Sequence, residues 1–284
     1  MFEIVEKRVL SPVVNLFKIK APAIARKRKP GQFIIFQIDE TGERVPLTIA
    51  DISAEDGTIT IICQALGKST TKLNSLKVGD TISSLAGPLG TPSHIENFGT
   101  AVCIGGGVGI AVAYPLAKAL KENGNNVISI MGFRSRELLF MEEELKATSN
   151  KLHVTTDDGT YARKGLVTDV LKEILENGTK VDFVLAIGPV PMMKAVCNIT
   201  KNHNIKTMVS LNPIMVDGTG MCGACRVTID GKTKFVCVDG PEFDGHHIDF
   251  EELMKRQAFY KEYEKLSFER FKHEGCCSGV LSQK

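Results

Sequence analysis

Four side chains in the last third of the chain have the types and spacing of ligands for a cluster of iron and sulfur. They are Asp217, Cys222, Cys225 and Cys237. Cysteines with gaps of four and two residues, followed by a distant cysteine, bind a two-iron two-sulfur cluster, and here an aspartate stands first in the pattern. Glycines between the ligands let the loop curl so that the side chains converge. The spacing predicts a [2Fe-2S] site with three thiolates and one carboxylate.

Two alternatives stay open for these cysteines. A structural zinc site also uses Cys and Asp ligands, although it usually contains a second close CxxC or His pair. The cysteines could also be buried without any ligand. A water molecule or another donor could take the place of Asp217. His246 and His247 follow the loop without a matching spacing, so we expect them to be ordinary loop residues.

A glycine-rich turn follows a short apolar run in the middle of the chain. Its residues are Gly105, Gly106, Gly107, Val108 and Gly109. Glycines between a strand and a helix let the backbone approach a pyrophosphate, and the amides of the helix N-terminus favour its negative charge. Because Ile110 interrupts the G-x-G-x-x-G pattern, tight backbone packing is the competing explanation. The alternating strands and helices around the turn favour nucleotide binding.

Three further segments leave predicted strands of the same region. Arg134 could contact a 2′-phosphate or stack on adenine. Asp157 could contact a ribose, or it could form an Asx turn. Gly188 and Pro189 could lead into a helix directed at a nicotinamide, or they could form an ordinary capped turn. These residues leave NAD and NADP both open.

The amino-terminal part contains two segments suited to the phosphates of a dinucleotide. Their residues are Arg44, Pro46, Leu47 and Thr48, and then Gly67, Ser69 and Thr70. Guanidinium and hydroxyl groups beside a glycine turn can bind phosphate oxygens. A strand and a plain turn are the alternative explanation.

Three structural units are needed to position these residues. Residues 1–98 contain β-branched runs at 9–19, 33–38, 58–65 and 81–85, broken by glycine and proline, which predicts an antiparallel β-barrel. Residues 99–211 alternate apolar strands with helical stretches, which predicts a doubly wound parallel sheet. Its strands are expected at 100–104, 127–131, 153–155, 181–187 and 207–211, with a helix over 112–122. Residues 212–284 are expected to form a small cluster lobe that ends in a helix over 250–271.

Composition excludes several classes of protein. The 284 residues include 35 basic and 33 acidic side chains, and this near balance gives no reason to expect a nucleic-acid partner. No apolar run is long enough to span a membrane, and the amino terminus lacks the apolar stretch of a signal peptide. We therefore expect a cytoplasmic protein, in which clustered cysteines bind metal more often than they form disulfides.

The other cysteines are expected to lie outside the cluster site. Cys63, Cys103 and Cys197 are predicted to be small buried apolar residues. Cys276 and Cys277 could form a vicinal disulfide or a second metal site, but free thiols in a flexible tail are the favoured interpretation.

The order of short motifs along the chain resembles that of the ferredoxin-NADP reductase superfamily. The motifs are PGQF at 30–33, RVPLT at 44–48, LGKST at 66–70, GPLG at 87–90, GGGVG at 105–109 and IGPVPMM at 187–193. Within that superfamily the chain more closely resembles the small subunits of NADH-dependent reduced ferredoxin:NADP oxidoreductases, also described as sulfide dehydrogenase small subunits. The electron-transfer subunits of dihydroorotate dehydrogenase are the nearest group outside these.

The resemblance implies FAD in the barrel, NAD(H) in the second unit with NADP(H) as a variant, and a [2Fe-2S] cluster in the lobe. It places the flavin contacts at Arg44, Pro46, Leu47, Thr48, Ile62, Gln64, Ser69 and Thr70. It places the nucleotide contacts at Gly105, Gly106, Gly107, Val108, Gly109, Arg134 and Gly188. It places the cluster ligands at Asp217, Cys222, Cys225 and Cys237.

The resemblance also implies an oxidoreductase subunit whose cofactors, and not its side chains, carry hydride and electrons. Its partner would be a larger flavo-iron-sulfur subunit, with NADH reacting at this chain, NADP at the partner and ferredoxin through the complex. Electron bifurcation is a further implication. Asp217 favours this group, because the dihydroorotate dehydrogenase subunits are expected to have a fourth cysteine. That subunit and a non-catalytic redox sensor are the alternatives.

Overall fold

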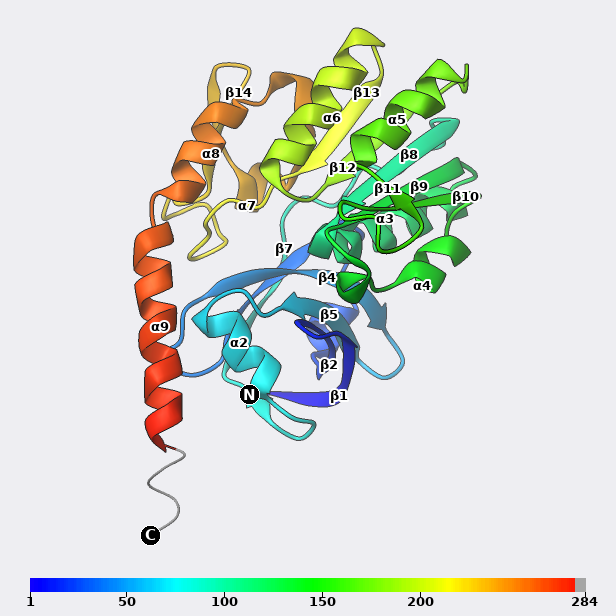
Figure 1. Ribbon diagram of the computed structural model, residues 1–284. Helices are drawn as coiled ribbons and strands as arrows, with labels where there is room; N and C mark the ends of the chain where they lie inside the picture. Colours follow the sequence, from blue (N-terminus) through cyan, green and yellow to red (C-terminus); the bar gives the residue numbers. More distant parts are fainter. Residues whose placement is uncertain (279–284) are drawn as a thin grey trace.

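The computed structural model describes the backbone of residues 1–278 and the side chains through residue 273. Figure 1 shows a β-barrel, an α/β unit above it, and a smaller lobe from which a long helix descends beside the barrel. The fold class predicted from the sequence is confirmed, since an antiparallel sheet, a mainly parallel sheet and a small carboxy-terminal lobe follow one another along the chain. None of the described helices has the length and apolar character needed to cross a membrane.

Seven antiparallel strands form the barrel. In spatial order they are β6 (Thr81–Ile82), β1 (Phe2–Ser11), β2 (Val14–Lys20), β5 (Thr58–Gln64), β4 (Val45–Ser53), β3 (Phe33–Gln37) and β7 (Ser84–Leu89). Only Ser83 separates β6 from β7, so the two edges of the sheet meet and the barrel is nearly closed. Two short helices, α1 (Pro22–Ala25) and α2 (Lys68–Ser75), lie between strands. Fully buried side chains such as Phe17, Phe36 and Ile61 fill the interior.

The run at 9–19, expected as one extended segment, belongs to two strands. β1 and β2 form a hairpin that turns at Pro12 and Val13. Proline has no amide hydrogen for the ladder and favours turn positions, so the β-branched residues around it pair with each other across the turn.

The second sheet is parallel apart from one edge strand. Its order is β11 (Arg163–Lys164), β10 (Lys151–Thr156), β9 (Asn126–Phe133), β8 (Thr100–Gly106), β12 (Phe183–Ile187), β13 (Lys206–Ser210) and β16 (Glu242–Asp244), with β16 antiparallel to β13. Helices α3 (Ile110–Glu122) and α4 (Glu142–Ala147) contribute to one apolar core, and α5 (Val167–Glu176) and α6 (Val190–Asn202) contribute to another. The strand order changes direction beside β8, where ligands bind in folds of this kind.

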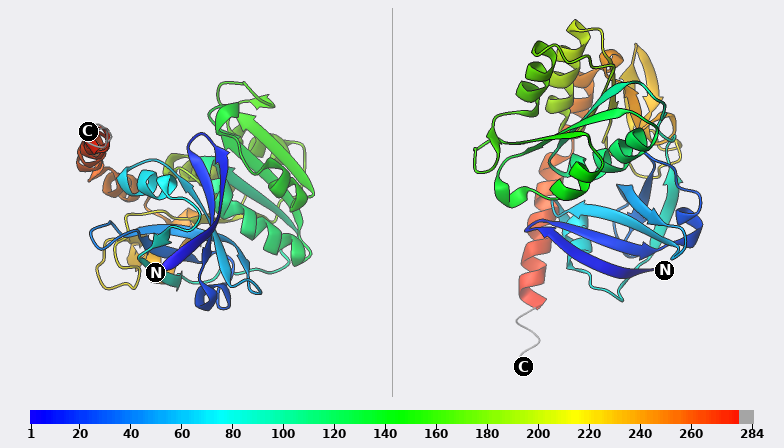
Figure 2. Two further views of the ribbon diagram at one scale, coloured as in Figure 1. Left: turned by 90° about the horizontal axis from the view of Figure 1, so that it is seen from below. Right: turned by 90° about the vertical axis from the view of Figure 1, so that its right-hand side faces the viewer.

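The lobe combines a hairpin with helices. Strands β14 (Arg226–Ile229) and β15 (Lys232–Phe235) precede the short helix α7 (Val236–Asp239). The prediction of a single terminal helix over 250–271 is wrong in one respect, because this segment contains two separate helices, α8 (Phe250–Ala258) and α9 (Lys261–Ser278). Buried Phe250 and Leu253 hold α8 on the lobe. Helix α9 instead runs beside α2 of the barrel (Figures 1 and 2), so the chain changes direction at Phe259 and Tyr260.

Candidate functional site

A cavity of about 810 Å³ lies between the barrel and the parallel sheet. One wall comes from β4 and β5 of the barrel, and the opposite wall comes from the carboxyl ends of β8, β9 and β12 with the turns that follow them. Apolar side chains form most of its surface, with a few polar groups such as Thr48, Gln64 and Arg134. An apolar cleft with few polar groups is typical of a cofactor site.

The structure brings most of the predicted flavin and nucleotide residues into this one cavity. The lining includes Pro46, Leu47, Thr48, Ile62, Gln64, Gly106, Gly107, Val108, Gly109, Arg134, Asp157, Gly188 and Pro189. Two groups of residues chosen for different cofactors therefore face one shared space, which allows a flavin and a nicotinamide to approach each other.

The glycine turn after β8 has two structural reasons for its composition. A Cβ on Gly109 would lie 2.4 Å from the Ile187 carbonyl oxygen, so this glycine is required where two backbone turns touch. Gly107 has φ +54° and no heavy atom within 4 Å of an added Cβ, so its backbone is open to the cavity. The two explanations for the glycines thus apply to different residues of one turn. Gly109 allows tight backbone packing, and Gly107 leaves the backbone open to a phosphate. The 13-residue helix α3 follows directly, and its N-terminal amides favour an anion there.

Five predicted cofactor residues lie outside the cavity lining, namely Arg44, Gly67, Ser69, Thr70 and Gly105. Gly105 is buried, and a Cβ there would meet Ile110 Cδ1 at 2.3 Å. Thr70 Oγ1 accepts the amide hydrogens of Leu66 and Gly67 at 3.0 Å each and so closes the turn before α2. Phosphate binding by these five residues remains a prediction.

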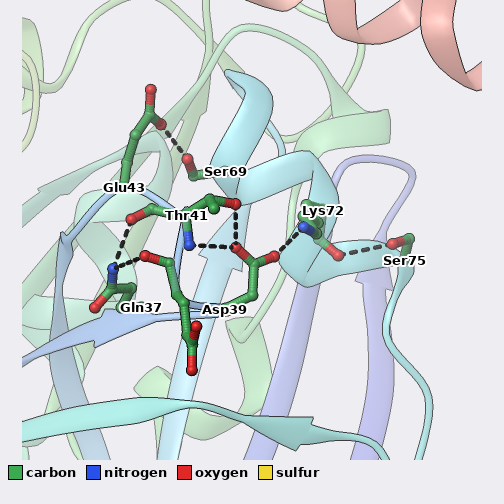
Figure 3. A network of polar contacts seen from close by, with 9 residues as sticks. Gln37, Asp39, Thr41, Glu43, Ser69, Lys72 and Ser75 are labelled. Atoms are coloured by element: carbon green, nitrogen blue, oxygen red, sulfur yellow. Dashed lines mark hydrogen bonds and ion pairs between the residues drawn. The ribbon is translucent and has the colours of Figure 1, made fainter.

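The loop before β4 and helix α2 share a polar network (Figure 3). The Ser69 hydroxyl donates to the Glu43 carboxylate, and the Lys72 ammonium pairs with Asp39. The Asp39 carboxylate also accepts the Thr41 amide at 3.1 Å and the Thr41 hydroxyl at 3.0 Å. The hydrogen bond from Lys72, followed by those from Thr41, lowers the pKa of Asp39. The Ser69 hydroxyl is therefore already bound to a carboxylate, and it would have to leave Glu43 to donate to a phosphate.

Several cavity residues were missed by the sequence prediction. Leu211, Asn212, Met215 and Pro241 line the side nearest the cysteine lobe. Leu211 and Asn212 follow β13, and the carboxyl ends of parallel strands meet at one edge, so that rule could have found them. Met215 and Pro241 carry no recognisable local signal. Met215 lies two residues before Asp217, and Pro241 lies four residues after Cys237. The cavity wall is therefore close in sequence to two predicted cluster ligands.

The cysteine loop and helix α7 bring the thiols of Cys225 and Cys237 together. Cys225 and Cys237 are 2% and 1% exposed, and the Cys237 amide donates to Cys225 Sγ at 3.4 Å. Cys222 is exposed at the surface of the same loop. Burial raises the pKa of the Cys237 thiol to about 12, and the hydrogen bond with Cys225 contributes to this rise. Because metal ligation needs thiolates, binding of a metal centre here would release protons.

The Asp217 carboxylate is hydrogen-bonded by the backbone of its own loop. Its carboxylate accepts the amide hydrogens of Thr219 at 2.6 Å and Cys222 at 2.7 Å, and the Thr219 amide is the main reason that the pKa of Asp217 is lowered. Among the side chains described, no three His, Cys, Asp or Glu residues converge as they would around a single metal ion. An iron-sulfur cluster spreads its ligands around several atoms, and a donor set of Cys222 and Cys225 in a glycine-rich loop, with Cys237 of α7 beside Cys225, fits it. Ligation by Asp217 stays a prediction.

The other singled-out residues have ordinary environments. Cys63, Cys103 and Cys197 are buried, which confirms the prediction for them. Burial raises the pKa of each of these thiols to about 12. His246 Nε2 lies 3.0 Å from Thr200 Oγ1, and His247 Nδ1 lies 3.5 Å from an Asp230 carboxylate oxygen. Cys276 and Cys277 lie outside the described side chains.

Comparison with known proteins gives two matching domain families. Residues 212–249 match the iron-sulfur cluster binding domain of dihydroorotate dehydrogenase B, and residues 103–198 match the oxidoreductase NAD-binding domain. The chain is 49% identical to the dihydroorotate dehydrogenase B (NAD(+)) electron transfer subunit homolog of Thermotoga maritima over 269 residues, or 95% of each chain. It is 33% identical to the corresponding electron transfer subunit of Geobacillus thermodenitrificans, over 84% of this chain and 94% of that protein.

The chain belongs to the dihydroorotate dehydrogenase B electron transfer subunit family. Among solved structures, this family member is 48% identical to a chain of the NADH-dependent reduced ferredoxin-NADP oxidoreductase, a structure described in terms of flavin-based electron bifurcation. The TM-score is 0.90, with 95% of this chain and 98% of that chain covered. A ferredoxin reductase of carbazole 1,9a-dioxygenase shares the fold at 20% identity and a TM-score of 0.60. This electron transfer subunit homologue is an oxidoreductase subunit of the ferredoxin-NADP reductase type.

Proposed function

We propose that this chain is the small subunit of an NADH-dependent reduced ferredoxin:NADP oxidoreductase. It would hold FAD and NADH in the shared cavity and a [2Fe-2S] cluster in the lobe, and it would exchange electrons with a larger flavo-iron-sulfur subunit in the cytoplasm. The observation that supports this most strongly is the cavity itself. Residues from the barrel, the parallel sheet and the base of the cysteine lobe line one space.

The bound flavin would supply the exchange between two-electron hydride chemistry and one-electron carriers. The side chains of the cavity position the reactants and exclude water. Pro46, Leu47 and Ile62 form an apolar barrel wall, while Thr48 and Gln64 provide polar groups that can orient a ring with hydrogen-bonding edges. No acid or base from the protein is needed for direct hydride transfer.

The opposite wall supports a dinucleotide. The amides between Gly107 and the start of α3 can bind a pyrophosphate, and Gly188 opens the turn after β12 toward the cavity. Asp157 places a carboxylate at the end of β10 that suits a ribose hydroxyl and repels a 2′-phosphate. The guanidinium of Arg134, on the same side of the cavity, would instead attract a 2′-phosphate. The match to an NAD-binding domain supports NADH as the nucleotide.

The cluster would lie on the other side of Met215 and Pro241, held by Cys222, Cys225 and Cys237 with Asp217 as the proposed fourth ligand. Asp217 would have to exchange its amide contacts for iron. The aspartate favours the ferredoxin:NADP group over a dihydroorotate dehydrogenase, whose electron-transfer subunits are expected to use four cysteines. The 48% identity to the NADH-dependent reduced ferredoxin-NADP oxidoreductase chain supports the same choice.

The proposal is tested by purifying the tagged full-length chain anaerobically with its natural partner. We expect NADP reduction that requires both NADH and reduced ferredoxin. Reduction of NAD by dihydroorotate, without any need for ferredoxin, would instead identify the complex as a dihydroorotate dehydrogenase. NADP reduction that proceeds with either donor alone would reject electron bifurcation.

A further inference from the structure

The loop that carries Asp217 is attached to the barrel by one arginine. Arg44, directly before β4, donates from Nε to the Val216 carbonyl oxygen at 2.9 Å and from Nη2 to the Asp217 carbonyl oxygen at 3.3 Å. The guanidinium is planar and its donors are fixed relative to one another, so two adjacent contacts restrict both the position and the orientation of the loop. Arg44 therefore reaches the proposed cluster loop and does not line the cavity.

The segment that carries Cys237 is attached to the barrel at a second point. Thr91 follows β7, and its amide donates to the Gly240 carbonyl oxygen at 2.7 Å. Its hydroxyl donates to the Val238 carbonyl oxygen at 3.0 Å. Both segments that contain predicted ligands are thus fixed to the barrel by hydrogen bonds to their main chain.

Close packing accompanies these bonds. Gly218 has φ +78°, and a Cβ there would lie 2.6 Å from Ile35 Cδ1 on β3 and 2.8 Å from Leu89 Cδ1 on β7. A Cβ on Gly90 would lie 3.1 Å from the Gly240 carbonyl oxygen. The chain beyond these segments faces the other unit, since β16 pairs with β13 and α8 packs against α6. The two ligand segments thus contact the barrel, while β16 and α8 contact the parallel sheet and its helix α6.

We propose that Arg44 is a positioning residue for the iron-sulfur site, and that it acts together with Thr91 to fix the cluster relative to the flavin. The inference rests on the proposed function and adds to it a role for residues outside the cavity. Arg44 lies only two positions before Pro46, where β4 begins to line the cavity. The strand that faces the proposed flavin site thus also carries the anchor of the cluster loop. Electron transfer falls steeply with distance, so a shared support keeps the two centres at one separation.

Two conservative variants test this in the full-length chain purified anaerobically. Arg44→Lys keeps the charge but loses the planar pair of donors, and Thr91→Val removes the hydroxyl at nearly constant shape. Arg8→Lys is the matched control, because Arg8 is also an exposed barrel arginine, and its contact at 3.5 Å is with Glu144 of α4. The measurements are the EPR spectrum and midpoint potential of the reduced cluster, and the rate at which an iron chelator bleaches its visible absorption.

We expect both variants to shift the EPR spectrum and the potential and to bleach about threefold to tenfold faster than wild type, as loss of one or two hydrogen bonds permits. Arg8→Lys should match wild type. Unchanged EPR, potential and bleaching in both variants would overturn the inference, as would loss of flavin alone in Arg44→Lys with the cluster unaltered. Wild-type protein without iron and sulfide would reject the proposed function itself, which separates the two failures.

Discussion

Replacement of Gly109 by alanine tests the close approach of the two turns that form the nucleotide wall. The added Cβ would lie 2.4 Å from the Ile187 carbonyl oxygen, about 1 Å inside the 3.4 Å at which ordinary contact begins. Gly109 has φ −58°, so alanine meets no backbone restriction there, and the effect should come from this contact alone. Forcing two backbone segments apart in a packed region costs about 1–3 kcal/mol.

The displaced turns both line the cavity, so nucleotide affinity should fall together with stability. We expect Gly109→Ala to lower the free energy of unfolding in urea by about 1–3 kcal/mol. NADH binding, followed by flavin fluorescence, should weaken by about tenfold, which corresponds to roughly 1.4 kcal/mol.

Gly178→Ala is the control. Gly178 has φ +75°, open space around an added Cβ and a position after α5 away from the cavity lining. It should lose about 1–2 kcal/mol of stability through its left-handed backbone and leave NADH affinity unchanged. A Gly109→Ala protein with wild-type stability and affinity would refute this explanation of the glycine turn.

Three further substitutions test single groups. Asp157→Asn should raise the use of NADPH relative to NADH in diaphorase assays by about threefold to fivefold, as expected for roughly 1 kcal/mol of charge repulsion, whereas Asp158→Asn outside the cavity lining should not. Asp217→Ala should alter the visible and EPR spectra of the cluster, and identical spectra would show that this carboxylate is no ligand. Burial raises the pKa of Glu242, which accepts a hydrogen bond from Ser93, so the stability that its protonated form provides is present below the unfolded pKa of about 4.3 and is lost as the pH rises through the folded pKa. Glu242→Gln should therefore gain stability relative to wild type in thermal unfolding as the pH rises above about 4.3, and parallel curves for the two proteins would contradict this.

The sequence pattern predicted the antiparallel and the parallel sheet, because most of their strands are short apolar runs bounded by glycine and proline. It did not predict the edge strands β11 and β16 of the second sheet. The hairpin turn inside 9–19 was missed, although Pro12 is itself a local turn signal. The division between α8 and α9 has no breaker residue in the sequence. Both segments favour a helix, but α8 packs on the lobe through Phe250 and Leu253 while α9 contacts α2 of the barrel.

The candidate site was predictable where a motif ends a strand. Gly107, Arg134 and Gly188 all line the cavity because parallel strands place their carboxyl ends at one edge. Met215 and Pro241 were missed because they reach the cavity from the lobe, through a contact between distant segments. The contacts of Arg44 with Val216 and Asp217 span 172 and 173 positions, and no spacing rule foresees them.

The central claim is that this chain carries a flavin and an iron-sulfur cluster as one electron-transfer unit. It is tested most directly by a visible absorption spectrum of the anaerobically purified protein, with flavin, iron, sulfide and zinc measured in the same sample. The proposed function predicts overlapping flavin and cluster bands, with about two iron atoms and two sulfides per chain. A colourless protein that contains zinc, or no metal at all, would contradict it.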